Sequence, residues 1–263
     1  MAELVDAHVH LSQYPLPEAC RVVDEARAAG VTTLLTAGVD LPTSQRDVDS
    51  LSALGHHIRV LVGIHPWWAD SYAETTAEAL ARLAREPRVV GFGEIGLDFV
   101  RGTHPEAIQT RAFEGMLDLA EQLGYPVLIH GDRLDERTHA AAQAAVRRRG
   151  GRVVGAVHGF AAGRETASGW LALGFALSFS GVLTWDERDD LRATAADVPL
   201  DRLLIETDTP APYPPQRARG EANHPRHAAE LTAALARLRG LDAADAAALV
   251  AANVRRVFPR VEG

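Results

Sequence analysis

The chain has 263 residues, of which 47% are hydrophobic and 24% are charged, and its formal net charge at pH 7 is −8. This length suits one large barrel or two modest domains, and the composition is typical of a soluble globular protein. The negative charge argues against a broad basic surface for nucleic acid, but not against nucleic acid in a cleft whose bound cations supply the positive field.

The N-terminus has no basic region followed by an apolar stretch, and no apolar run approaches the ~20 residues of a membrane span. We therefore expect no membrane partner and a cytoplasmic location. The single cysteine, Cys20, excludes an intrachain disulfide and a cysteine-based zinc site. All 27 basic residues are arginine. The absence of lysine excludes a Schiff-base lysine and a carbamylated bridging lysine.

Eight short apolar runs have the character of β-strands, and segments with helical signals alternate with them. The predicted strands are Val5–Leu11, Val31–Ala37, Ile58–His65, Val89–Leu97, Pro126–His130, Val153–His158, Phe175–Ser180 and Leu203–Glu206. The predicted helices are Pro17–Ala29, Thr43–Leu54, Thr75–Arg85, Pro105–Leu123, Asp135–Arg149, Glu165–Leu173, Asp186–Ala195, Pro225–Arg239, Ala243–Ala251 and Asn253–Phe258.

A strand followed by a helix, eight times at about 30 residues each, predicts an α/β fold with a parallel sheet closed into a (β/α)8 TIM barrel. We expect a single domain over 1–263, with the last two helical segments as a C-terminal addition. A doubly wound open sheet is the alternative, but it would need a glycine-rich phosphate turn after the first strand, and none is present. The Pro- and Arg-rich stretch Pro210–Arg219 is expected to form a loop.

Histidine and carboxylate side chains gather at the predicted C-terminal strand ends, where such barrels place their active sites. They are His8, His10, His65, Glu94, His130, His158 and Asp208. A lone histidine at a strand end is more often a hydrogen-bonded core residue than a ligand. The convergence of this whole set favours a metal site instead. The remaining histidines are expected at the surface: His56, His57, His104, His139, His224 and His227.

Imidazole and carboxylate groups suit Zn, Mn, Fe or Co, whereas pure Mg or Ca sites prefer oxygen ligands. Six ligand groups exceed the need of one tetrahedral ion, and two ions about 3.5–4 Å apart would use them. We propose His8, His10 and Asp208 for one ion, and His130 and His158 for the other. Glu94 would bridge the two ions, at the strand where many two-metal barrels have a carbamylated lysine.

These residues lie in motifs that resemble the TatD family of metal-dependent hydrolases, within the amidohydrolase-like barrels. The matching motifs are DAHVHL at Asp6–Leu11, GIHP at Gly63–Pro66, GEIGLD at Gly93–Asp98, VLIH at Val127–His130, HGF at His158–Phe160, FSG at Phe179–Gly181, DRLLIETD at Asp201–Asp208 and NVRRVF at Asn253–Phe258. The resemblance implies a divalent-metal hydrolase, commonly a deoxyribonuclease that removes nucleotides from a 3′ end. It also implies metal ligands at His8, His10, Glu94, His130, His158 and Asp208, and a substrate contact at His65.

One departure lies next to the predicted site. The family usually has Ser-Arg-Asp after the strand-five histidine, whereas this chain has Gly131-Asp132-Arg133, which displaces the arginine by one place. This position should touch substrate more than metal. Arg133 is therefore a candidate for binding the substrate's anion, and a surface ion pair is its other interpretation.

The mechanistic hypothesis is that a water shared by the two ions loses a proton near neutral pH and attacks phosphorus or a carbonyl carbon. Asp208 would accept the proton, Glu94 would hold both ions, and Glu206 would orient a ligating histidine, with an internal ion pair as its other interpretation. Trp67 and Trp68 could stack on a base, although packing against the barrel is favoured for them.

Three functions remain open from the sequence. The first is a deoxyribonuclease acting on single-stranded DNA ends with two divalent ions, Zn, Mn or Mg. The second is an ester or amide hydrolase such as an aminoacyl-tRNA deacylase, and the third is a non-catalytic barrel scaffold. A monomer is plausible.

Overall fold

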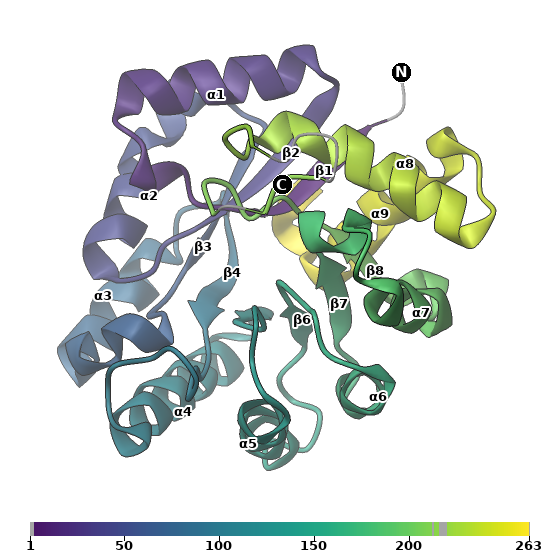
Figure 1. Cartoon of the computed structure of the whole chain (residues 1–263). Coiled ribbons are helices and arrows are strands. Elements are labelled where there is room, and N and C mark those ends of the chain that lie inside the picture. The colour runs from purple at the N-terminus through teal and green to yellow at the C-terminus, as the bar shows by residue number, and fades with distance from the viewer. Residues whose placement is uncertain (1–2, 212, 216–219, 263) are drawn as a thin grey trace.

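A computed structural model of the chain describes residues 3–211, 213–215 and 220–262. Strands and helices alternate along it, with the strands at the centre and the helices around them (Figure 1). The strands are β1 (Leu4–Val9), β2 (Val31–Ala37), β3 (Ile58–Val62), β4 (Val89–Ile95), β5 (Val127–Ile129), β6 (Gly155–Val157), β7 (Ala176–Phe179) and β8 (Leu203–Ile205).

Nine α-helices are present in the described part of the chain. They are α1 (Leu16–Ala28), α2 (Leu41–Leu54), α3 (Glu74–Leu83), α4 (Glu106–Leu123), α5 (Glu136–Arg147), α6 (Arg164–Ala172), α7 (Asp189–Asp197), α8 (Ala228–Arg239) and α9 (Ala243–Val257). Some of their ends carry the expected signals. The side chain of Asp40 accepts a hydrogen bond from the backbone N–H of Thr43 at the start of α2, and Gly124 ends α4 in the left-handed conformation.

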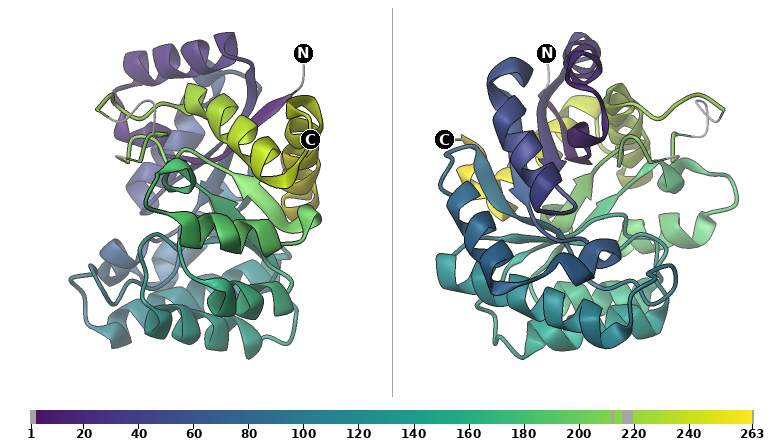
Figure 2. Two further views of the ribbon diagram at one scale, coloured as in Figure 1. Left: turned by 45° about the vertical axis from the view of Figure 1, so that its right-hand side comes forward. Right: turned by 90° about the vertical axis from the view of Figure 1, so that its left-hand side faces the viewer.

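All eight strands form one sheet in the order β1 to β8, and every neighbouring pair is parallel. Backbone contacts between the two edges of this sheet close it into a barrel: His10 N–H donates to the carbonyl of Thr209 at 2.7 Å, and Asp208 N–H donates to that of His8 at 3.0 Å. The predicted TIM barrel is therefore confirmed, and the doubly wound sheet is excluded. Figure 2 shows the helices wrapped around the strands from two further sides.

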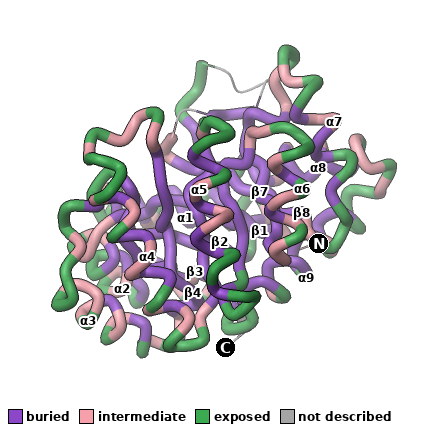
Figure 3. Tube along the Cα trace, turned by 90° about the horizontal axis from the view of Figure 1, so that it is seen from below, coloured by how far each residue is buried: buried purple, intermediate pink, exposed green. Residues whose placement is uncertain are grey.

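The strands are buried on both faces, since helices cover the outside and side chains fill the inside. Every residue of β4 to β8 is buried, and Figure 3 shows buried chain at the centre with exposed chain confined to the periphery. This explains why the strands appear in the sequence as continuous apolar runs rather than as alternating patterns.

Two expectations about the C-terminal half of the chain were wrong in detail. The predicted helices Ala243–Ala251 and Asn253–Phe258 form the single helix α9, because the side-chain amide of Asn253 donates to the carbonyls of Leu200 and Leu203 and anchors the helix. The helix predicted at Asp186–Ala195 is displaced to Asp189–Asp197, after a 3-10 turn at Gly181–Thr184.

Two histidines expected at the surface, His139 and His227, are instead buried. His139 lies on the inner face of α5 and accepts a hydrogen bond from the indole N–H of Trp170 at 3.3 Å. Part of the predicted loop Pro210–Arg219, namely 212 and 216–219, lies outside the described residues. Within the described ranges, no helix combines the length and apolar character needed to cross a membrane.

Candidate metal centre

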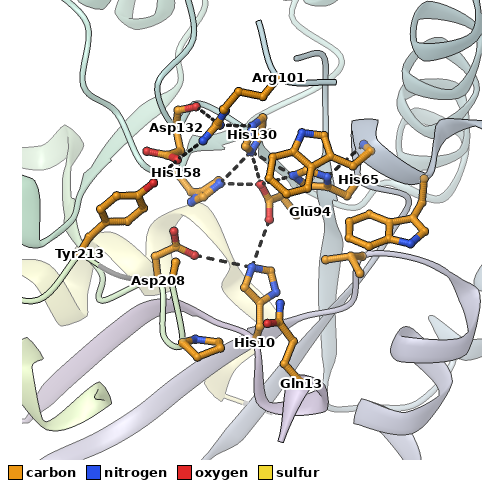
Figure 4. A pocket seen from close by; sticks show the side chains of 15 residues that line it. His10, Gln13, His65, Glu94, Arg101, His130, Asp132, His158, Asp208 and Tyr213 are labelled. Carbon is orange, nitrogen blue, oxygen red and sulfur yellow. Dashed lines mark hydrogen bonds and ion pairs between the residues drawn. The ribbon is translucent and has the colours of Figure 1, made fainter. Parts of the chain in front are cut away.

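The C-terminal ends of the strands bring the predicted ligands to one rim of the barrel. His8 and Glu94 lie within β1 and β4, and the others follow their strands by one to three residues: His10, His65, His130, His158 and Asp208. Because parallel strands end at the same edge, residues far apart in sequence converge there. They border a cavity of about 380 Å³ (Figure 4), apart from His8, which is fully buried.

The first ligand cluster consists of His8, His10, Asp208 and one oxygen of Glu94. The Nε2 atoms of His8 and His10 are 3.1 Å apart, and both lie 3.4 Å from Oε2 of Glu94. Oδ1 of Asp208 is 3.4 Å from His8 Nε2 and 3.6 Å from His10 Nε2. All four side chains are buried, so the four atoms face one small volume away from bulk water.

The second ligand cluster is built around the other oxygen of Glu94 and consists of that oxygen, His65, His130 and His158. Oε1 of Glu94 is 2.6 Å from Nε2 of His158 and 3.3 Å from Nε2 of His65, and it also contacts Nδ1 of His130. Nδ1 of His130 is 3.3 Å from each of the other two nitrogens. Glu94 thus offers one oxygen to each cluster, as a bridging carboxylate would.

The spacing of the atoms in the first ligand cluster fits the coordination of a divalent ion, whereas Oε1 of Glu94 lies closer to the imidazoles of the second cluster, at hydrogen-bond distance. An ion about 2.0–2.2 Å from each ligand atom sets neighbouring ligand atoms about 3.0 Å apart in octahedral and about 3.4 Å apart in tetrahedral coordination. The separations in the first ligand cluster, 3.1–3.6 Å, match this range. Three overlapping groups with metal-binding spacing occur in the described chain: His8–His158–Asp208, His8–His10–Glu94 and His65–Glu94–His130.

The second nitrogen of three of these imidazoles is held by a group outside the clusters. Nδ1 of His10 donates to the carbonyl of Ala37 at 2.8 Å, and Nδ1 of His158 lies 3.2 Å from Oε1 of Glu206. Each bond places the proton on Nδ1 and leaves the Nε2 lone pair facing the cluster. For His130 the outer partner is Asp98, whose carboxylate lies 3.5 Å from Nε2.

Burial and proximity shift the pKa values of these groups strongly. Burial alone would raise the pKa of Glu94, but the imidazoles of His158, His65 and His130 outweigh it and hold that pKa well below its usual range. Burial likewise opposes charge on His158, yet the carboxylates of Glu94 and Glu206 raise its pKa well above normal. Burial lowers the pKa of His65 to about 4. The buried carboxylates therefore demand positive charge nearby, which protons or metal ions can supply.

The two predicted substrate contacts differ in position. His65 lies in the second ligand cluster, within reach of a metal as well as of a substrate. Arg133 is exposed, adopts a left-handed backbone conformation (φ 54°), and stacks its guanidinium over the ring of Tyr213 at 4.4 Å. It does not border the cavity, whereas Tyr213 does.

Arg101 borders the cavity instead, and sequence reasoning missed it. Its guanidinium donates to Oδ2 of Asp132 at 2.9 Å and to Asp98 at 3.2 Å, and it lies 3.3 Å from Nε2 of His130. The available signal was its position three residues after the GEIGLD motif. Trp67 and Trp68 also border the cavity, where packing against the barrel had been favoured for them.

Comparisons with known proteins agree with this geometry. A family model described as TatD related DNase matches residues 5–259. A Klebsiella pneumoniae (strain 342) protein named 3'-5' ssDNA/RNA exonuclease TatD is 35% identical over 244 residues, 90% of each chain. A Mycobacterium tuberculosis (strain H37Rv) protein named as an uncharacterized metal-dependent hydrolase, TatD, is 32% identical over 264 residues, 97% of each chain.

Solved structures show the same fold. The crystal structure of YjjV, a TatD homologue from Escherichia coli K12, superposes with a TM-score of 0.87 at 26% identity and covers 97% of this chain and 98% of that one. An organophosphorus hydrolase variant from Deinococcus radiodurans, at 14% identity and a TM-score of 0.60, shares the fold and covers 97% of this chain and 92% of its own. Since the family model spans nearly the whole chain and relatives above 30% identity align over nine-tenths of it, the chain belongs to the TatD-related DNase family.

Proposed function

We propose that this chain is a divalent-metal-dependent hydrolase that removes nucleotides from the 3′ end of single-stranded nucleic acid. The observation that carries the proposal is the pair of ligand clusters joined by Glu94 at the barrel rim. Family membership and the printed names of the relatives, 3'-5' ssDNA/RNA exonuclease among them, support this substrate class.

In this proposal two divalent ions, Zn, Mn or Mg, bind side by side. His8, His10 and Asp208 would hold one, His130 and His158 the other, and Glu94 both. When bound, such ions lower the pKa of water from about 15.7 toward about 7 and stabilise charge on the phosphate. His65, the remaining member of the second ligand cluster, lies 3.3 Å from Oε1 of Glu94 and would serve as a further ligand or contact the substrate.

The protein's own groups would position the substrate and move the proton. The carboxylate of Asp208, whose pKa is held below its usual value by His8 and its neighbours despite burial, is ionised and can accept a proton from the attacking water. Arg101 would bind the substrate's anion from the cavity wall. For Arg133, which lies outside the cavity, a contact to the substrate's anion stays a prediction. A cavity of about 380 Å³ suits one terminal residue rather than a duplex.

A second candidate is hydrolysis of a carboxylic ester or amide, such as an aminoacyl-tRNA. The observation that favours it is the acidic cavity wall: Asp132 stands where the family usually has arginine, and its carboxylate is 2.9 Å from Arg101. The intact set of ligand positions argues against a non-catalytic scaffold. The cytoplasmic location and the monomeric state stay predictions.

The deciding experiment incubates the protein with Mg²⁺, Mn²⁺ or Zn²⁺ and a labelled single-stranded oligonucleotide. We expect mononucleotides to be released, chelator to stop their release, and Glu94→Ala and Asp208→Ala to abolish it while circular dichroism stays unchanged. Cleavage of aminoacyl substrates with no nucleotide release would support the second candidate. Full turnover in a metal-free, chelator-treated sample would refute both.

A further inference from the structure

Trp67 and Trp68 are placed unusually for large apolar side chains. They follow β3 in a 3-10 segment, Pro66–Ser71, and are 41% and 38% exposed at the cavity edge. Within the described ranges they are the two aromatic residues among the exposed large hydrophobic side chains. Exposed apolar surface at the mouth of a polar cavity marks a place where a ligand covers it.

Trp67 is fixed from several sides. Its indole N–H donates to Asp98 Oδ2 at 2.9 Å, its backbone N–H donates to Nδ1 of His65 at 3.1 Å, and its carbonyl accepts from His104 at 3.0 Å. The guanidinium of Arg101 lies over its ring, 5.4 Å from the centroid. Trp67 therefore belongs to the framework that orients His65 and Asp98, so substituting it would disturb the ligand clusters as well.

The backbone of Trp68 is hydrogen-bonded within the same segment, but its side chain is not held by hydrogen bonds as that of Trp67 is. Its N–H donates to the carbonyl of His65 at 2.9 Å, and its carbonyl accepts from the hydroxyl of Ser71 at 2.7 Å. No hydrogen bond from its indole N–H is found in the described structure. The indole is 5.6 Å from the His65 ring and tilted by 30° from Trp67, with the two indole centroids 6.2 Å apart. It is thus a preorganised, partly exposed ring beside the second ligand cluster.

The rest of the cavity wall restricts what this face can take. Glu94, Asp132 and Asp208 make the wall acidic, and Arg101, which also donates to Asp132, adds a guanidinium that suits a phosphate. Figure 4 shows His65 and Tyr213 on opposite sides of the cavity, with Glu94 between them. When a phosphate binds at the ligand clusters, a planar group attached to it meets the two indoles if it extends along the His65 side of the cavity. A nucleobase offers a flat π-face to such a ring whatever its hydrogen-bonding edge.

We propose that Trp68, supported by Trp67, is the stacking surface for the base of the substrate's terminal nucleotide. This inference rests on the proposed function and assigns a base-binding subsite within it. Binding energy at this subsite would come from stacking, so it should tolerate all four bases and favour purines, which have the larger ring.

The test compares two 5′-fluorescein decanucleotides that differ at the 3′ residue, which is either adenosine or an abasic tetrahydrofuran. Initial rates with Mn²⁺ give kcat/KM, and fluorescence anisotropy with a phosphorothioate last linkage gives Kd. Stacking on one aromatic side chain corresponds to a preference of roughly 5- to 150-fold for the adenine end. We expect wild type to show it in both measurements.

The variants separate a stacking role from a merely apolar one. Trp68→Ala and Trp68→Leu should bring the preference close to one, and Trp68→Phe should keep most of it. Leu200→Ala, with 39% exposure outside the cavity, is the matched control and should behave as wild type. A folded Trp68→Ala that keeps the wild-type preference overturns the inference. Failure of wild type to cleave either oligonucleotide counts against the proposed function, while the ratio of Kd values still decides the stacking role.

Discussion

At the scale of single residues, the carboxylate of Glu206 lies behind His158, one of the proposed metal ligands. Its Oε1 faces Nδ1 of His158 at 3.2 Å and accepts a hydrogen bond from the N–H of Gly159, while its Oε2 has no partner in the described structure.

The substitution Glu206→Gln removes the charge that favours a proton on Nδ1 of His158. Partners of this kind typically change metal affinity 10- to 100-fold. We expect a loss of that size by calorimetric titration, with Glu165→Gln at the exposed start of α6 as control; unchanged affinity would limit Glu206 to holding Gly159.

Two arginines compete for the role of anion contact, and their surroundings separate them. Arg101 borders the cavity and lies 3.3 Å from Nε2 of His130, whereas Arg133 is exposed on Tyr213. Hydrogen bonds to charged groups are worth about 1.5–3 kcal/mol, so Arg101→Gln should lower kcat/KM about 10- to 150-fold. Arg133→Gln should lower it less than about threefold at the terminal residue. Steady-state kinetics on a labelled oligonucleotide measures both, and the opposite order would return the role to Arg133.

At the scale of elements, apolar runs located all eight strands; the bounds of β2 are those predicted, and the other seven strands are shorter than predicted. The third strand was predicted to reach His65 and ends at Val62. Gly63 packs so closely on Gly93 that a Cβ atom would lie 2.8 Å from its carbonyl carbon, and the chain then leaves the sheet. Such close approaches are absent from a one-dimensional pattern. The continuity of α9 was also missed for this reason. The sequence around Asn253 suggested a break between two helices, but the hydrogen bond from its side chain to the carbonyl of Leu200 holds it within one helix.

His139, which lies buried between α5 and α6, should make the free energy of unfolding depend on pH. Burial, together with the charge of His130, lowers the pKa of His139 to about 4 from an ordinary 6.5. The folded protein keeps the ring neutral while the unfolded chain takes up a proton, so stability present above pH 6.5 is lost as pH falls toward 4. At about 1.4 kcal/mol per pKa unit this amounts to about 3 kcal/mol.

The variant His139→Gln should remove that part of the pH dependence, because glutamine does not titrate. Urea unfolding between pH 7 and 4 should show wild type losing about 3 kcal/mol more than the variant. His56→Gln, at an exposed position, should follow wild type throughout. Parallel curves for wild type and His139→Gln would mean that the ring charges without cost in the folded state.

At the scale of the whole molecule, closure of the barrel determined how much of the site was predictable. Eight strand ends meeting at one rim suffice to gather His8, His10, Glu94, His130, His158 and Asp208, whatever the rotamers. How Glu94 divides its two oxygens between the clusters depends on side-chain torsions. Whether the side chain of Arg101 reaches the cavity depends on the path of the loop after β4. Neither is encoded in residue spacing, which explains why these details came from the structure.

The convergence of buried carboxylates and imidazoles also predicts that metal stabilises the fold. An ion that binds the folded but not the unfolded chain raises the free energy of unfolding by about 2.7 kcal/mol at a concentration of 100 Kd. For a chain of this size this corresponds to an increase of about 5–10 °C in Tm. We expect calorimetry to show Mn²⁺ or Zn²⁺ raising the Tm of wild type by about that amount per occupied site, and chelator reversing it. Glu94→Gln weakens both ligand clusters at once and should lose most of the increase, whereas Asp208→Asn touches the first ligand cluster and should lose about half. Equal increases in all three proteins would place the ions elsewhere, and this readout does not depend on activity.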